Sequence, residues 1–105
     1  MKTITLQLGG KERTLDVGKF YFTKYLGEYI GSDPLKSNAN DAGTQFNYSV
    51  AIVYAGLMTD YKAKGLVVDF TKEDVEGWVG VLEMDEVVSI IDEYGKLNKS
   101  EVPGE

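Results

Sequence analysis

The stretch that decides the fold is "ITLQLGGKERTLDV", residues 4–17. In its first half, apolar and polar residues alternate as they do in a half-buried strand, which puts three apolar side chains on one face: Ile4, Leu6 and Leu8. Its second half alternates again, with Arg13, Leu15 and Val17 on one face and Thr14 and Asp16 on the other. Gly9 and Gly10 separate the two halves, and tight hairpin turns need the positive φ that glycine supplies. The stretch therefore predicts an N-terminal β-hairpin.

A hairpin is not stable alone in water, so a helix has to cover its apolar face. The spacing of apolar residues changes to a helical period over residues 19–31, and Gly31 suits the end of that helix. The stripe of this helix consists of Phe22, Tyr25, Leu26, Tyr29 and Ile30. The polar, proline-containing segment 32–43 then predicts a loop, and we expect it to be the most mobile part of the chain.

The second predicted helix covers residues 44–64 and closes at Gly65. Its main stripe consists of Phe46, Val50, Val53, Tyr54, Leu57 and Tyr61. Its side and rear carry further apolar residues: Tyr48, Ala51, Ile52 and Ala55. A helix that is apolar nearly all round is either central to the fold or engaged on two faces.

The third predicted helix follows Thr71, which suits an N-cap with Asp74 three residues later. Its apolar positions are Val75, Trp78, Val79 and Leu82. Because Trp78 lies in the centre of this stripe, we expect it to stabilise the core rather than to serve as an exposed docking side chain. The preceding "LVVDF", residues 66–70, predicts a third strand or an extended linker.

The last predicted helix covers residues 85–96 and buries Val87, Ile90, Ile91 and Tyr94. The expected fold class is therefore α+β, a mostly helical chain with an N-terminal β-hairpin followed by about four helices. We expect one domain over residues 1–96 and a polar tail over residues 97–105.

The composition excludes several kinds of chemistry. The chain of 105 residues has no histidine and no cysteine, so the commonest general base, thiolate zinc sites and cysteine nucleophiles are missing. It contains no phosphate-binding loop and no dinucleotide-binding motif. Two acidic groups lack a catalytic or metal-binding spacing and are expected to be solvated: Asp33, Asn38, Asn40 and Asp41, and Glu83, Asp85, Glu86, Asp92 and Glu93. We expect no enzyme, no catalytic residue, no cofactor and no metal.

The net charge is −6, and it is unevenly distributed. Residues 1–65 carry eight basic and six acidic side chains, whereas residues 66–105 carry three basic and eleven acidic ones. This balance argues against binding to nucleic acid, because phosphates would be repelled. The N-terminus has no continuous apolar run of a signal peptide, and no segment is long enough to span a membrane. These features predict a cytoplasmic protein.

Four residues are candidates for partner binding. Gly77 and Gly80 lie opposite Trp78 on the helical wheel, where a bare face could admit another backbone or could only be tolerated surface. Tyr48 and Ile52 lie on the rear of the helix over residues 44–64. This rear is covered by the rest of the chain, or it binds a partner helix or a second copy in a homo-oligomer.

Several blocks taken together resemble a known family. The hairpin is followed by an aromatic helix, a "DPL" loop with "ND", "IVYAGL" at residues 52–57, "FTKEDVEGWV" at residues 70–79 and "VVSIIDEYG". This order resembles the tail assembly chaperones of long-tailed bacteriophages, above all those of phages and prophages of low-GC Gram-positive bacteria. The resemblance covers nearly all of residues 1–96.

The resemblance implies a small non-enzymatic protein of the host cytoplasm that is made during virion assembly. Such chaperones bind the tape measure protein, help tail tube subunits to polymerise around it, and leave the finished particle. The family has no catalytic residues to carry over. A rival hypothesis is an acidic inhibitor or decoy that occupies a cationic site on a host protein, motivated by the acidic residues 66–105.

Overall fold

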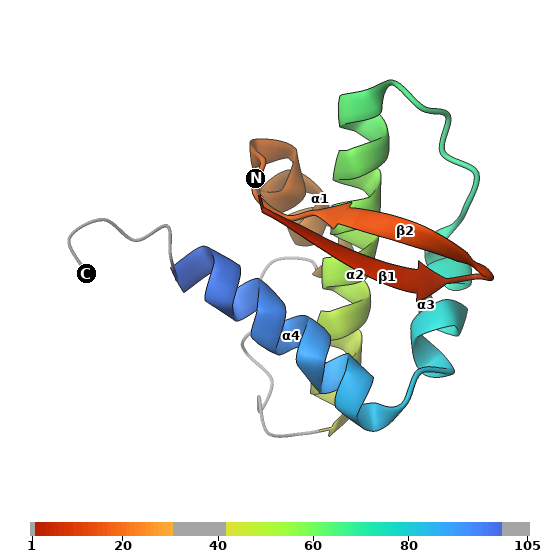
Figure 1. The fold of residues 1–105 in the computed structure, drawn as a ribbon, viewed down its shortest axis with the longest axis vertical. Helices are drawn as coiled ribbons and strands as arrows, with labels where there is room; N and C mark the ends of the chain where they lie inside the picture. The colour runs from red at the N-terminus through yellow and green to blue at the C-terminus, as the bar shows by residue number, and fades with distance from the viewer. Residues whose placement is uncertain (1, 31–41, 100–105) are drawn as a thin grey trace.

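The computed structural model describes residues 2–30 and 42–99, and it confirms the predicted α+β fold of a hairpin followed by four helices. The elements in chain order are β1 (Thr3–Leu8), β2 (Lys11–Asp16), α1 (Phe20–Ile30), α2 (Ala42–Lys64), α3 (Lys72–Gly80) and α4 (Met84–Lys99). Figure 1 shows the hairpin lying across α2, with α1 and α4 beside α2 and α3 near the tip of the hairpin.

The hairpin forms as the sequence predicts. β1 and β2 pair antiparallel, with Leu8 opposite Lys11 and Thr3 opposite Asp16, so the turn contains only Gly9 and Gly10. These two glycines have φ of 61° and 85°. Positive φ at both central residues is the requirement of a type I′ turn, whose twist matches that of the two strands.

Helix α2 is the centre of the molecule, which is the first of the two alternatives that its apolar character leaves open. It contributes six buried apolar side chains to the core: Val50, Ala51, Ile52, Val53, Ala55 and Leu57. The hairpin packs closely against it at Gly56, where an added Cβ would lie 2.6 Å from the Cβ of Leu15. The absence of a side chain at Gly56 lets the sheet rest directly on the helix.

Helix α3 begins with the predicted capping box. The backbone N–H of Asp74 donates to the hydroxyl of Thr71 at 3.0 Å, and the backbone N–H of Thr71 donates to the carboxylate of Asp74 at 2.9 Å. Two N–H groups that the first turn of the helix would leave unpaired are thereby satisfied.

Trp78 stabilises the fold, as predicted, and it does so by covering the hairpin turn. Its indole lies against Gly9, with the guanidinium carbon of Arg13 4.2 Å from the ring centroid. The ring of Phe70 lies 6.0 Å away, centroid to centroid. The side chain is only partly buried, so it forms the outer layer of the core.

The alternation of β2 places Asp16 on the face opposite Leu15 and Val17, and the structure shows that this side chain is nevertheless buried. Asp16 is only 5% exposed. One of its carboxylate oxygens accepts the backbone N–H of Gly18 at 3.3 Å, and the other pairs with the ammonium group of Lys19 at 3.0 Å. The chain turns directly after β2 into α1, and this turn encloses the carboxylate, which a strand period cannot reveal.

Of the two alternatives for residues 66–70, the extended linker is right and the third strand is wrong. The segment joins α2 to α3 without entering the sheet, and Val67 is 87% exposed. It begins at Gly65, whose φ of 69° ends α2 as predicted. Short β-branched runs fit an extended backbone whether or not a neighbouring strand is present.

The helix boundaries differ from the predicted ones at a few places. Helix α3 ends at Gly80, so Leu82 packs against the core from the following turn rather than from the helix. Helix α4 continues to Lys99, and Leu97 still packs against the core, so ordered structure extends beyond the predicted boundary at residue 96. Gly31 and residues 32–41 of the predicted loop lie outside the described residues, and with them Asp33, Asn38, Asn40 and Asp41, which are expected to be solvated.

Candidate functional site

Large apolar side chains that are exposed gather in three places within the described parts of the chain. They are the start of α1 with Phe20 and Tyr21, the linker with Leu66, Val67 and Val68, and the junction of α3 and α4 with Val81, Met84 and Val88. We call the last group, Val81, Met84 and Val88, the apolar patch.

A groove lined only by apolar residues and glycine lies beside the apolar patch, whereas the hollow at Phe20 and Tyr21 is also lined by Thr23 and Lys24. Val81 and Met84 are 82% and 80% exposed, so the turn between the helices and the first turn of α4 present their side chains to solvent. The groove has a volume of about 180 Å³ and is lined by Phe46, Val79, Gly80, Leu82, Met84, Val87 and Val88. Every lining residue is apolar or glycine, so the groove can accept an apolar side chain of a partner.

Gly80 keeps one wall of this groove bare. A Cβ added at Gly80 would lie 3.8 Å from the ring of Phe46, which is ordinary van der Waals contact. A larger side chain at this position would extend into the space between α3 and α2. The glycine therefore leaves room at the place where a partner side chain would enter.

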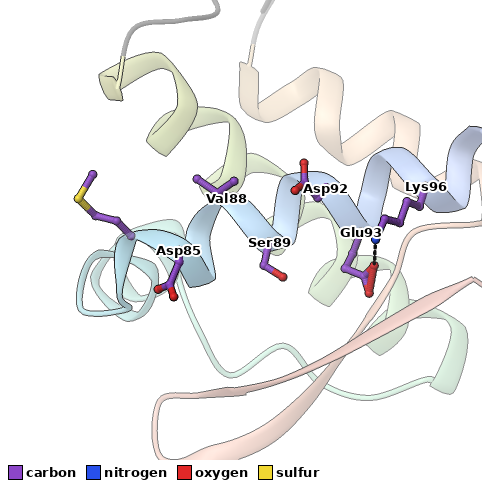
Figure 2. Close-up of a pocket in the computed structure, with 7 residues that line it drawn as sticks. Asp85, Val88, Ser89, Asp92, Glu93 and Lys96 are labelled. Carbon is purple, nitrogen blue, oxygen red and sulfur yellow. Dashed lines mark ion pairs between the residues drawn. The ribbon is translucent and has the colours of Figure 1, made fainter.

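The outer face of α4 continues from the apolar patch into an acidic surface. Figure 2 shows Val88 near the start of the helix and the polar side chains along its length: Asp85, Ser89, Asp92, Glu93 and Lys96. Glu93 and Lys96 form an ion pair at 3.8 Å. The hollow along this face, about 490 Å³, is lined by α4 alone and is therefore an open surface. A partner on the patch meets carboxylates directly beside the apolar side chains.

The structure separates the four predicted partner-binding residues. Gly80 lines the groove, and Gly77 lies on the exposed side of α3 with open space around it. Ile52 has no exposed surface, so the rear of α2 is covered by the same chain at this point and offers nothing to a partner.

Tyr48 lies partly buried between α2 and α4. Its ring meets that of Tyr94 edge-on, with centroids 6.4 Å apart. Burial, and then the neighbouring Tyr94, raise the pKa of the Tyr48 hydroxyl. Tyr48 therefore contributes to packing between the two helices, and whether its remaining exposed surface also contacts a partner stays a prediction.

Sequence reasoning missed the three residues of the apolar patch. Val81 and Met84 flank the short break between two helices, where no periodic stripe marks them. Val88 follows Met84 by one helical turn and lies outside the face of α4 that packs against the core, which includes Val87 and Ile90. Placing Val88 on a helical wheel would have shown an apolar residue on the solvent face.

The acidic residues at the start of α4 form part of a local helix cap. The carboxylate of Glu86 accepts the backbone N–H of Glu83 at 3.1 Å, and both side chains are exposed. Within residues 2–30 and 42–99, no three carboxylates gather so that they could hold one metal ion. In the same part of the chain, no helix has both the length and the apolar character needed to cross a membrane.

No protein-family model, curated protein or solved structure matches the chain in comparisons of sequence and fold.

Proposed function

We propose that this protein is a non-enzymatic chaperone of phage tail assembly, which binds the tape measure protein and promotes polymerisation of the tail tube. The structural observation that carries the proposal is the apolar patch with its groove at the junction of α3 and α4. The family is suggested by the sequence resemblance, and the patch supplies a surface suited to that activity.

The client that fits this surface is an amphipathic helix. Such a helix presents apolar side chains at intervals of one turn, and binding proteins receive them in apolar grooves. Met84 and Val88 are themselves one turn apart, and the groove beside them is lined without a charged group. An unassembled tape measure protein exposes helical stripes of this kind, and covering them would keep it from aggregating.

The acidic surface beside the patch supports the same activity in a second way. Exposed carboxylates continue along α4 from the patch, and like charges on the outside of a complex disfavour further association. A client helix bound at Met84 would therefore be enclosed by a surface that repels other chaperone–client complexes.

The test is co-expression with the tape measure protein that the proposal names as the client. We expect the partner to become soluble and to remain bound at about 1 M salt, where the screening length is about 3 Å. The double variant Met84→Ser with Val88→Ser should lose this effect. Leu66→Ser with Val67→Ser is the matched control, because it removes two exposed apolar side chains far from the groove and should retain the effect.

Three results would contradict the proposal. The partner could stay insoluble with the wild-type chain, or the two double variants could behave alike. Alternatively, the chain could leave the tape measure protein unbound and bind instead a cationic host protein, in a complex that dissociates as salt rises. That last result would favour the acidic inhibitor, whose contacts would be made by the exposed carboxylates of α4.

A further inference from the structure

Strand β1 has a free edge. The sheet contains only β1 and β2, so each strand has one side without a neighbouring strand in the described chain. The backbone N–H of Val17 donates to the carbonyl of Lys2 at 3.0 Å, which shows that even-numbered residues of β1 bond toward β2. In an antiparallel pair the alternate residues then direct their N–H and C=O groups the other way. These outward residues are Thr3, Thr5 and Gln7.

A groove runs along this free edge. It has a volume of about 400 Å³, and its two sides are β1 and α4. From β1 it is lined by Ile4, Thr5 and Leu6, and from α4 by Asp85, Glu86, Ser89, Ile90 and Glu93. Figure 1 shows the strand and the helix running side by side, and the side chain of Lys2 reaches the carbonyl of Leu97 at one end.

The helical side of the groove is negatively charged. Asp85, Glu86 and Glu93 line it, and among the described residues no lysine or arginine does. In Figure 2, Asp85, Ser89 and Glu93 extend from α4 toward the side on which the hairpin lies. Glu93 pairs with Lys96 at 3.8 Å, and the carboxylate of Glu86 accepts the backbone N–H of Glu83 at 3.1 Å. A groove that combines the outward backbone groups of a strand edge with three carboxylates is complementary to a cationic, extended peptide.

We propose that this groove binds a basic, extended segment of a partner protein, which joins the sheet as a third strand beside β1. The strand would donate and accept backbone hydrogen bonds at Thr3, Thr5 and Gln7. The groove is separate from the apolar patch, and its occupancy does not depend on the chaperone activity proposed above.

The dimensions of the groove specify the side chains of the segment. Residues 85 and 93 of α4 are separated by about 12 Å along the helix axis. Side chains at positions i and i+4 of an extended strand are separated by about 13 Å and share one face. A segment with lysine or arginine at both positions would therefore reach Asp85 and Glu93 together.

The first test uses a fluorescein-labelled peptide of sequence Lys-Thr-Val-Thr-Lys with blocked ends. We expect binding to slow hydrogen exchange of the backbone amides of Thr5 and Gln7. Two further peptides carry N-methyl groups on alternate residues, in opposite phases. Because only one edge of the peptide faces β1, one phase should abolish binding and the other should not. Equal behaviour of both phases, or exchange protection away from β1, would overturn the proposal.

The second test separates the charge of this groove from the charge of the whole surface. Asp85→Asn with Glu93→Gln should weaken peptide binding roughly three- to tenfold at low salt, the effect of two exposed ion pairs. Glu73→Gln with Glu76→Gln is the matched control, since it changes the net charge equally on the exposed side of α3. An equal loss in both double variants would refute a specific site.

A final measurement distinguishes a partner protein from a second copy of this chain. The linker residues Leu66, Val67 and Val68 are exposed and extended, so the linker of a second copy is a competing occupant of the same edge. Hydrogen exchange at Thr5 and Gln7 should be independent of protein concentration without peptide. Protection that increases with concentration would assign the groove to a second copy and overturn the proposal.

Discussion

Gly9 lies directly against the indole of Trp78, and a Cβ added at Gly9 would lie 2.6 Å from Cε2 of that ring. The contact joins the turn of the hairpin to α3. Gly9 has a φ of 61°, so this position requires glycine for two reasons: a left-handed backbone and a lack of space for a side chain. Gly10, the other residue of the turn, also has a positive φ, but no atom lies within 4 Å of its added Cβ, so a side chain would have space there.

We therefore predict that Gly9→Ala and Gly10→Ala differ in stability. Both place a side chain at positive φ, which costs about 1–2 kcal/mol. Gly9→Ala also displaces the indole, and overpacking of this kind costs a further ~1–3 kcal/mol. Denaturant titrations followed by circular dichroism give both free energies of unfolding. Equal values would show that Trp78 moves aside without loss.

The second prediction concerns the guanidinium of Arg13, whose Cζ lies 4.2 Å from the centroid of Trp78. The same group donates to the carbonyl of Leu8 at 3.0 Å and to the hydroxyl of Tyr61 at 3.1 Å, which fixes its orientation over the ring. Cation–π pairs contribute about 0.5–2 kcal/mol, depending on how far they are desolvated.

A double-mutant cycle with Arg13→Ala and Trp78→Ala should give a coupling energy of about 1 kcal/mol. The free energy of unfolding of the two single variants and the double variant is sufficient to obtain it. Additivity within about 0.3 kcal/mol would mean that the two side chains stabilise the fold independently.

The third prediction is that substitution by alanine changes the free energy of unfolding in opposite directions at two glycines inside helices. Alanine usually stabilises a helix interior by about 1 kcal/mol relative to glycine. Gly77→Ala should show this gain, because its added Cβ meets open space. Gly56→Ala should be destabilising by about 1–3 kcal/mol, because its Cβ would lie 2.6 Å from Cβ and 3.1 Å from Cα of Leu15.

Thermal unfolding of the two variants measures this difference directly. Gly77→Ala also tests the bare face of α3 as a contact surface, since a partner whose backbone lies against it would bind the variant more weakly. A stabilised variant with unchanged partner binding would remove Gly77 from the candidate site.

The fourth prediction concerns alkaline pH. Burial is the main cause that raises the pKa of Tyr29, Tyr48 and Tyr54 in the folded protein. Unfolded tyrosines release their protons near pH 10, before these folded ones do. The unfolded chain then binds fewer protons, so the free energy of unfolding is unaffected below pH 10 and falls as the pH rises above it.

Tyr48→Phe should make this decline shallower, because one of the perturbed hydroxyls is gone. Tyr21→Phe is the matched control, since the side chain of Tyr21 is 47% exposed at the start of α1. Urea titrations at several pH values between 9 and 11 measure the slopes. Identical slopes in both variants would contradict the role given to Tyr48.

The features that the sequence predicts correctly depend on neighbours in the chain. The Gly9–Gly10 turn and the cap formed by Thr71 and Asp74 each need only a few consecutive residues, and both form as expected. Likewise, Gly65 ends α2 at the predicted position. Local rules of φ and hydrogen bonding suffice for such features.

The features that the sequence does not predict depend on tertiary neighbours. The alternation of β2 does not reveal that Asp16 is buried, because the turn into α1 encloses it. The run Leu66–Val68 has strand-forming residues, yet it does not join the two-stranded sheet. The apolar patch becomes visible only in the structure. There, α3 and α4 are separated by a short break, and Met84, the first residue of α4, has its side chain in solvent.

The contact between Gly9 and Trp78 also has a consequence for biosynthesis. The hairpin is synthesised before α3, which covers its turn, and well before Leu97, whose carbonyl accepts from Lys2 across 95 positions. A two-stranded sheet alone is at best marginally stable. The nascent chain therefore holds an uncovered apolar hairpin until α3 and α4 have left the ribosome, and the native fold closes only then.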